Sequence, residues 1–159
     1  PKFIYIKNRI LSFFNPNGGT HNFQSDKAID AISSGGYFGK GIGEGTLKNR
    51  VPEAHTDYII SVISEEFGVV AIVLLLILFL FFVYTIFKKI NLEKNEKIKL
   101  ALTGTVCLII FQALIHLGVN IRLFPTTGMT LPFLSYGGSS IISVSILSGI
   151  ILNLTKRKV

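Results

Sequence analysis

Residues 67–87 read FGVVAIVLLLILFLFFVYTIF and carry no charged side chain. A helix of this length rises about 30 Å, which matches the thickness of the hydrocarbon core of a bilayer. Two further runs are similar: residues 100–118 have polar atoms only on Thr, Gln, His and Cys, and residues 138–154 precede a basic tail. The sequence therefore predicts an all-α integral membrane protein with transmembrane helices at residues 59–87, 100–118 and 138–155.

Basic residues flank the predicted helices and indicate their orientation. Residues 88–99 carry five lysines against two glutamates, and the tail, residues 156–159, adds three more basic residues. Positively charged short loops are retained on the cytoplasmic side of a membrane, so both segments are predicted to be cytoplasmic. Residues 1–58, interpreted as the end of a preceding span followed by a large loop, and residues 119–137 are then extracytoplasmic.

The net charge of +7 raises the question of a nucleic-acid partner. Half of the basic residues lie in the predicted cytoplasmic segments, where attraction to anionic lipid explains them, so no nucleic-acid partner is expected. Seven more lie in residues 1–58. A long loop escapes the charge rule, and its basic surface would attract an anionic headgroup such as a pyrophosphate. The single cysteine, Cys107, rules out an internal disulfide and is interpreted as a packing residue.

The large loop has an order of its own. Residues 15–19, Asn-Pro-Asn-Gly-Gly, are expected to end the helix that precedes them. Residues 22–33 repeat apolar side chains at near-helical spacing, which predicts a short amphipathic helix on the membrane surface. Residues 35–45 contain six glycines, but no strand precedes them and no Lys-Ser/Thr pair follows, so dinucleotide and P-loop sites are excluded. This stretch is either a backbone that approaches a ligand closely or a flexible turn.

One carboxylate, Asp57, lies at the predicted membrane boundary. It ends the stretch PEAHTD at residues 52–57, where an enzyme acting on a lipid-linked substrate would meet the polar head of that substrate. As a general base it would take the proton of an attacking hydroxyl. Helix dipole and poor hydration would act on its basicity in opposite directions. The structural alternative is that Thr56 or Asp57 only caps the helix beginning near residue 58.

Two adjacent acids, Glu65 and Glu66, lie close to the apolar run. They are costly there unless they reach the interface or pair with cations. Lys40, Lys48 and Arg50 are the available partners in the loop, so an interfacial salt bridge is the simplest interpretation.

Thr105, Gln112, His116 and Asn120 fall within a sector of about 100° on the second predicted helix. Lipid offers no hydrogen-bond partner, so this stripe should face protein or a wet cavity. Hydrogen bonding between helices is the favoured role for Gln112, whereas the role of His116 stays open. Irregular backbone follows at residues 119–137, and the amides at the start of the third helix are able to hold an anion.

Two stretches resemble a known family. GKGIGEGTLKNRVPEAHTDYIISVISEEFG, residues 39–68, and HLGVNIRLFPTTGMTLPFLSYGGSSI, residues 116–141, closely resemble the outer loops of the SEDS proteins (shape, elongation, division and sporulation). The resemblance runs from about residue 9 to residue 154, and Met-Thr-Leu-Pro at residues 129–132 looks more like the division members than the elongation members. It implies a ten-span helical fold, of which this chain would cover the last three spans and the large outer loop before them.

The resemblance also implies a function. SEDS proteins polymerise lipid II, the undecaprenyl-pyrophosphate-linked disaccharide pentapeptide, into the glycan strands of peptidoglycan in the bacterial inner membrane. They work with a class B penicillin-binding protein, and the division members act at the septum with other division-complex membrane proteins. The essential acid of the family falls in the PE-x-HTD motif, which makes Asp57 the catalytic candidate.

Further residues are candidates for substrate binding. Many division members carry Lys at the position of Thr127, so another cation would have to act here, and Arg122 is the nearest in sequence. The acids show no metal-ligand spacing, so no metal site is predicted; no cofactor is required and a divalent cation is left open. The candidate substrate-binding residues are Lys40, Lys48, Arg50, His55, Glu65, Arg122, Thr127 and Ser139.

Two alternatives to the glycosyltransferase remain. A lipid II flippase would use the polar intramembrane stripe without needing Asp57 as a base. A non-catalytic fragment would only bind division partners, because seven spans of the family fold are missing. For the chain assayed by itself we expect no activity.

Overall fold

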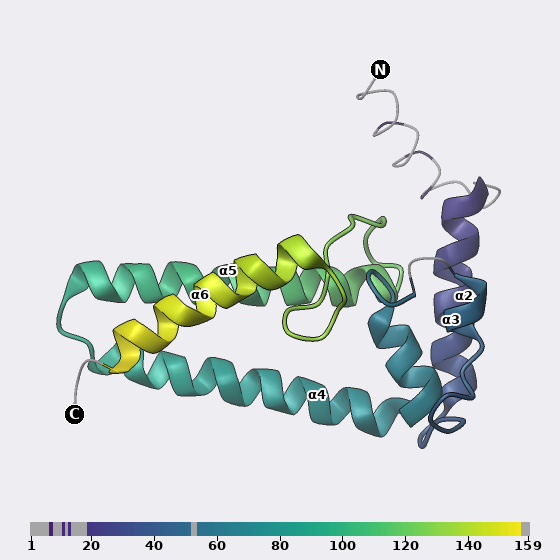
Figure 1. The fold of residues 1–159 in the computed structure, drawn as a ribbon, viewed down its shortest axis with the longest axis horizontal. Helices are drawn as coiled ribbons and strands as arrows, with labels where there is room; N and C mark the ends of the chain where they lie inside the picture. The colour runs from purple at the N-terminus through teal and green to yellow at the C-terminus, as the bar shows by residue number, and fades with distance from the viewer. Residues whose placement is uncertain (1–6, 8–10, 12, 14–18, 52–53, 157–159) are drawn as a thin grey trace.

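The computed structural model describes residues 7, 11, 13, 19–51 and 54–156 (Figure 1). Several predictions concern residues outside this set: most of the end of a preceding span at residues 2–14, most of the helix-breaking segment at residues 15–19, the first two residues of PEAHTD, and the last three residues of the tail. The side chain of Lys48 also lies outside the described part of the structure.

The described residues form helices and loops and contain no strand. The helices are α2 (Gly19–Gly35), α3 (Leu47–Arg50), α4 (Ile59–Leu92), α5 (Glu96–Asn120) and α6 (Gly138–Lys156). The last three are long and apolar enough to cross a membrane. This confirms the predicted all-α architecture with three spans; the side of the membrane on which each loop lies stays a prediction.

The segment predicted as a loop at residues 88–99 is mostly helical. The two spans continue beyond their apolar runs, and only residues 93–95 connect α4 to α5. Lys and Glu are good helix formers, so the helices extend past the charge-free stretch. Asn95 then starts α5, because its side-chain oxygen accepts a hydrogen bond from the amide of Lys97 at 3.0 Å.

The three spans pack along one side and expose apolar side chains on the other. Figure 1 shows α4 and α5 antiparallel, with α6 crossing over α5. A buried cluster joins them, whereas large apolar residues such as Leu74, Leu80 and Phe111 are exposed, as expected of a surface that faces lipid or further helices. The buried cluster comprises Ile86, Ile90, Leu102, Val106, Ile109 and Ile151.

Helix α2 lies crosswise at the N-terminal end of α4 (Figure 1), which agrees with a helix along the membrane plane. Small residues form the face of α2 that packs against the rest of the chain. Ala28 and Ala31 are buried, whereas Phe23 and Ile29 are exposed. Close backbone approach explains this choice of small residues: a Cβ at Gly35 would lie 2.0 Å from the carbonyl oxygen of Ser64 on α4.

The glycine-rich stretch covers a break in α4. Gly68 has φ 79° inside the helix, so the helical hydrogen-bond ladder is interrupted there. The loop supplies the missing partners from both directions. The amide of Lys40 donates to the carbonyl of Glu65 at 2.9 Å, and the amide of Val69 donates to the carbonyl of Gly36 at 3.0 Å. The glycines thus permit close backbone approach, but to a helix rather than to a ligand.

Candidate functional site

Asp57 lies in the turn that leads into α4 and is only 6% exposed. Helix α4 starts after Tyr58, which occupies the N-cap position and whose side chain makes no cap hydrogen bond. The Tyr58 hydroxyl instead lies 3.3 Å from the Ser25 hydroxyl on α2. The turn is therefore enclosed between α2 on one side and α5 on the other.

Donors from distant segments hold the backbone carbonyls just before Asp57. The carbonyl of His55 accepts from the amide of Tyr136 at 3.1 Å. The carbonyl of Thr56 accepts from the Ser135 hydroxyl at 2.8 Å and from Nε2 of His116 at 3.2 Å. Since these donors come from α5 and from the loop before α6, residues 55 and 56 are fixed to two other elements.

Asn120, the last residue of α5, extends the same arrangement to Asp57. Its Nδ2 donates to the Asp57 carbonyl at 2.9 Å, and its Oδ1 accepts from the Ser61 amide at 3.2 Å and the Ser61 hydroxyl at 2.8 Å. The amide of Ser61 belongs to the first turn of α4, where helix donors lack a partner of their own. Asn120 thus satisfies both sides of the loop-to-helix junction, and the Asp57 backbone has little freedom to move.

The polar stripe of α5, which comprises Thr105, Gln112, His116 and Asn120, mostly bonds to other segments of the chain. Gln112 donates to the Thr130 carbonyl at 2.9 Å and to the Ser140 hydroxyl on α6 at 3.2 Å, which confirms the predicted hydrogen bonding between helices. His116 is fully buried, and its Nδ1 lies 3.3 Å from Nδ2 of Asn120, so it is fixed as the Nε2–H tautomer that the Thr56 carbonyl requires. Thr105 differs from the others, because its hydroxyl returns to carbonyls of its own helix.

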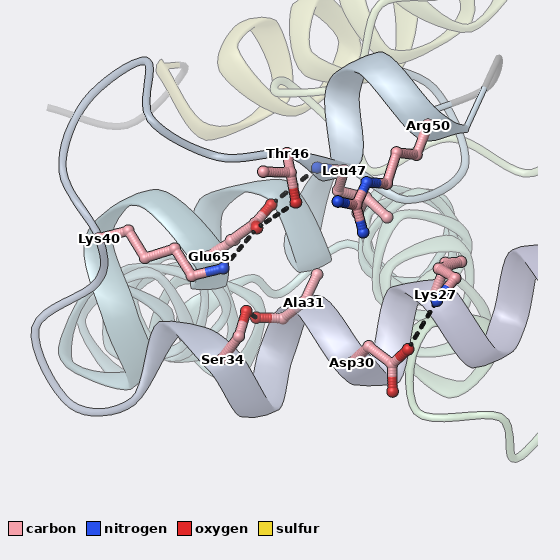
Figure 2. A pocket seen from close by; sticks show the side chains of 9 residues that line it. All are labelled: Lys27, Asp30, Ala31, Ser34, Lys40, Thr46, Leu47, Arg50 and Glu65. Carbon is pink, nitrogen blue, oxygen red and sulfur yellow. Dashed lines mark hydrogen bonds and ion pairs between the residues drawn. The ribbon is translucent and has the colours of Figure 1, made fainter.

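Three predicted substrate-binding residues line one cavity of about 130 Å³ (Figure 2). These are Lys40, Arg50 and Glu65. The Glu65 side chain is 1% exposed. Its carboxylate accepts hydrogen bonds from Nζ of Lys40 at 2.9 Å, from the Thr46 hydroxyl at 3.1 Å and from the Leu47 amide at 2.9 Å. These contacts offset the cost of burying the carboxylate. The salt-bridge interpretation of Glu65 is therefore confirmed.

Arg50 brings unneutralised positive charge to this cavity. In Figure 2 its guanidinium reaches the space from α3, while Lys27 and Asp30 line it from α2 as a pair 3.1 Å apart. The described part of the chain places no carboxylate within ion-pair distance of Arg50. Lys27 and Asp30 were not predicted as site residues; their spacing of three on a predicted helix was the only available signal.

The other predicted binding residues lie elsewhere. Arg122 forms an ion pair with Asp26, which ties the loop after α5 to α2. The side chains of His55 and Thr127 are exposed. Ser139 lines a separate groove of about 370 Å³ between α5 and α6, together with Gln112 and other residues. Within the described residues, no three His, Cys, Asp or Glu side chains gather as a metal site.

Residues 3–159 match the family FTSW_RODA_SPOVE, described as "Cell cycle protein". The chain is 40% identical over 158 residues to the "Probable peptidoglycan glycosyltransferase FtsW" of Caulobacter vibrioides (strain NA1000 / CB15N), covering 98% of this chain and 40% of that protein. It is 38% identical over 160 residues to the protein of the same name from Enterococcus hirae, covering 99% and 40%.

The chain is also similar to part of a solved structure. It is described as "Structural coordination of polymerization and crosslinking by a peptidoglycan synthase complex", and one of its chains matches with a TM-score of 0.72 and 30% identity over 95% of this chain and 41% of that chain. The chain therefore spans about 40% of the length of the relatives it matches. From its three apolar helices and these matches, the chain is a multi-pass membrane protein that belongs to the FtsW/RodA/SpoVE family, also called the SEDS family.

Proposed function

We propose that Asp57 is the catalytic base of a peptidoglycan glycosyltransferase that polymerises lipid II at the division septum of the bacterial inner membrane. One observation carries the proposal: donors from α5 and the loop before α6 hold three consecutive carbonyls, of His55, Thr56 and Asp57. A general base must keep a fixed position relative to the hydroxyl it deprotonates, and such a network provides that position.

The proposed reaction transfers the growing glycan chain to an acceptor sugar. The Asp57 carboxylate takes the proton of the 4-hydroxyl of an acceptor GlcNAc as that oxygen attacks the anomeric carbon of the MurNAc that ends the growing chain. The bond from this carbon to the lipid-linked phosphate breaks, and undecaprenyl pyrophosphate leaves with the bonding electrons. Positive charge stabilises that leaving group.

The cavity of Figure 2 is our candidate for holding the pyrophosphate. Lys27, Lys40 and Arg50 contribute three positive charges against two negative ones from Asp30 and Glu65. Lys40 is engaged by Glu65 and Lys27 by Asp30, so Arg50 is the cation that meets the phosphate directly. Arginine suits this role because its planar guanidinium forms two parallel hydrogen bonds to phosphate oxygens.

The partners follow from the same assignment. A class B penicillin-binding protein would cross-link the strands that this enzyme forms, and other membrane proteins of the division complex would position both. The similarity to a chain of a peptidoglycan synthase complex supports a partner of this kind. Two residues of the polar stripe of α5 that a flippase would use, His116 and Asn120, are engaged in holding the Asp57 turn, and no observation favours transport over transfer.

A full-length protein containing this chain, purified and supplied with lipid II, tests the proposal. We expect Asp57→Asn to abolish glycan-strand formation while lipid II binding and association with the penicillin-binding protein persist. Glu96→Gln is the matched control, because it removes one carboxylate at the far end of the spans. Strand formation by Asp57→Asn at the wild-type rate would refute the assignment.

A further inference from the structure

The tip of the glycine-rich loop presents large apolar side chains outward. Tyr37 is 78% exposed, Phe38 is 85% exposed and Ile42 is 80% exposed. Three such residues within six positions form an apolar surface that water disfavours. We call Tyr37, Phe38 and Ile42 the loop tip.

The depth of the loop tip is fixed relative to α4. The amide of Val70 donates to the Tyr37 carbonyl at 3.3 Å, and the Gly41 amide donates to the Glu66 carbonyl at 3.1 Å. Contact is so close that a Cβ at Gly68 would lie 2.2 Å from the Tyr37 carbonyl oxygen. The loop tip therefore stays level with residues 66–70 of the helix and cannot move along it independently.

Residues 66–70 are where α4 enters the bilayer. The charge-free run begins at residue 67 and ends at residue 87, which leaves a length of about 30 Å for a hydrocarbon core of the same thickness. A shift of the membrane boundary by more than a turn would bury Glu66 or Lys88 in hydrocarbon, which costs several kcal/mol. The loop tip therefore lies at the boundary itself, on whichever side of the cell that end of α4 faces.

We propose that the loop tip inserts into the interfacial layer of the lipid bilayer and anchors the α2–α3 region against the membrane. Tyr is suited to this depth because tyrosine is enriched at membrane–water interfaces, and Phe is common on the apolar face of segments that lie in the interface. The one charge between residues 35 and 43, on Lys40, is engaged by Glu65 and so does not oppose insertion. This inference does not depend on a catalytic role for Asp57.

Because the chain contains no tryptophan, Phe38→Trp introduces a single indole as a depth probe. The 159-residue chain is reconstituted into phosphatidylethanolamine and phosphatidylglycerol vesicles that carry lipids brominated either near the glycerol backbone or near the methyl end. We expect the indole at position 38 to be quenched more by the shallow bromine than by the deep one. Ile77→Trp, in the middle of the charge-free run of residues 67–87 and 56% exposed, is the control and should show the opposite order.

Ile42→Trp is the second variant and should also be quenched by the shallow bromine. Both substitutions replace exposed side chains, so helix content measured by circular dichroism should be unchanged. Indoles at positions 38 and 42 that resist both brominated lipids but are quenched by aqueous iodide would overturn the proposal. Shallow quenching that disappears when the chain is part of a full-length protein would also overturn it, because further helices rather than lipid would then cover the loop tip.

Discussion

Asn120→Ala removes the side chain that joins the Asp57 turn to α5. In its absence the Asp57 carbonyl loses the Nδ2 donor and the Ser61 amide loses the Oδ1 acceptor. Loss of a buried hydrogen-bond partner costs about 1–3 kcal/mol, so the two losses together cost about 2–6 kcal/mol. The cost falls on the junction before α4 rather than on the apolar contacts of the three spans.

Hydrogen exchange followed by mass spectrometry measures this locally. Every 1.4 kcal/mol corresponds to about a tenfold change in an opening equilibrium, so amides of residues 54–62 should exchange at least about 30-fold faster in Asn120→Ala. Peptides from the middle of α5 should keep their protection. Asn153→Ala, at an exposed asparagine on α6, is the matched control and should change neither region. Unchanged exchange at residues 54–62 in Asn120→Ala would refute the role given to this side chain.

Three further outcomes are expected. Gly39→Ala should lower the melting temperature in detergent, because φ is +78° and the new Cβ would lie 2.2 Å from a helix carbonyl. Left-handed strain alone costs about 1–3 kcal/mol. An unchanged melting temperature would contradict the close contact of the glycine-rich loop with the break in α4. Lys40→Met should destabilise more than Glu65→Gln, because it leaves a carboxylate that is 1% exposed without its cation; the reverse order in melting would count against the pairing. Arg50→Gln in a full-length protein should lower kcat/KM for lipid II about 10-fold or more, and an unaltered kcat/KM would exclude Arg50 from phosphate binding.

The sequence was sufficient to predict the spans because the physical signal is local. A charge-free run of about twenty residues has few alternatives to a membrane helix, and all three such runs became α4, α5 and α6. Their ends were less predictable, because lysine and glutamate favour helix as strongly as the apolar residues before them. The side chain of Asn95, a local capping signal, marks the actual start of α5.

The buried face of α2 was not predictable from hydrophobicity. Phe23 and Ile29 are its strongest apolar signals, yet both are exposed. Contact between backbones decides the packing, and it selects Ala28, Ala31 and Gly35 because larger side chains would not fit against α4. A pattern of small residues at helical spacing was the signal that could have indicated this face.

The candidate site was also predictable only in part. Pairing of Glu65 with a loop lysine followed from the cost of a charge beside a membrane, and Lys40 is the partner. The carbonyl network around Asp57 did not follow, because it joins residues about 60 positions apart. Sequence showed Asn120 only as the end of a polar stripe and could not show which carbonyl it would meet.

The rate of glycan-strand formation at saturating lipid II, compared between a full-length protein and its Asp57→Asn variant, tests the central claim most directly. A general base contributes about 10²–10⁴-fold, so we expect kcat to fall by at least about 100-fold while the affinity for lipid II and the melting temperature stay unchanged. If kcat is preserved in Asp57→Asn, the proton is removed by another group and the account of this site is contradicted.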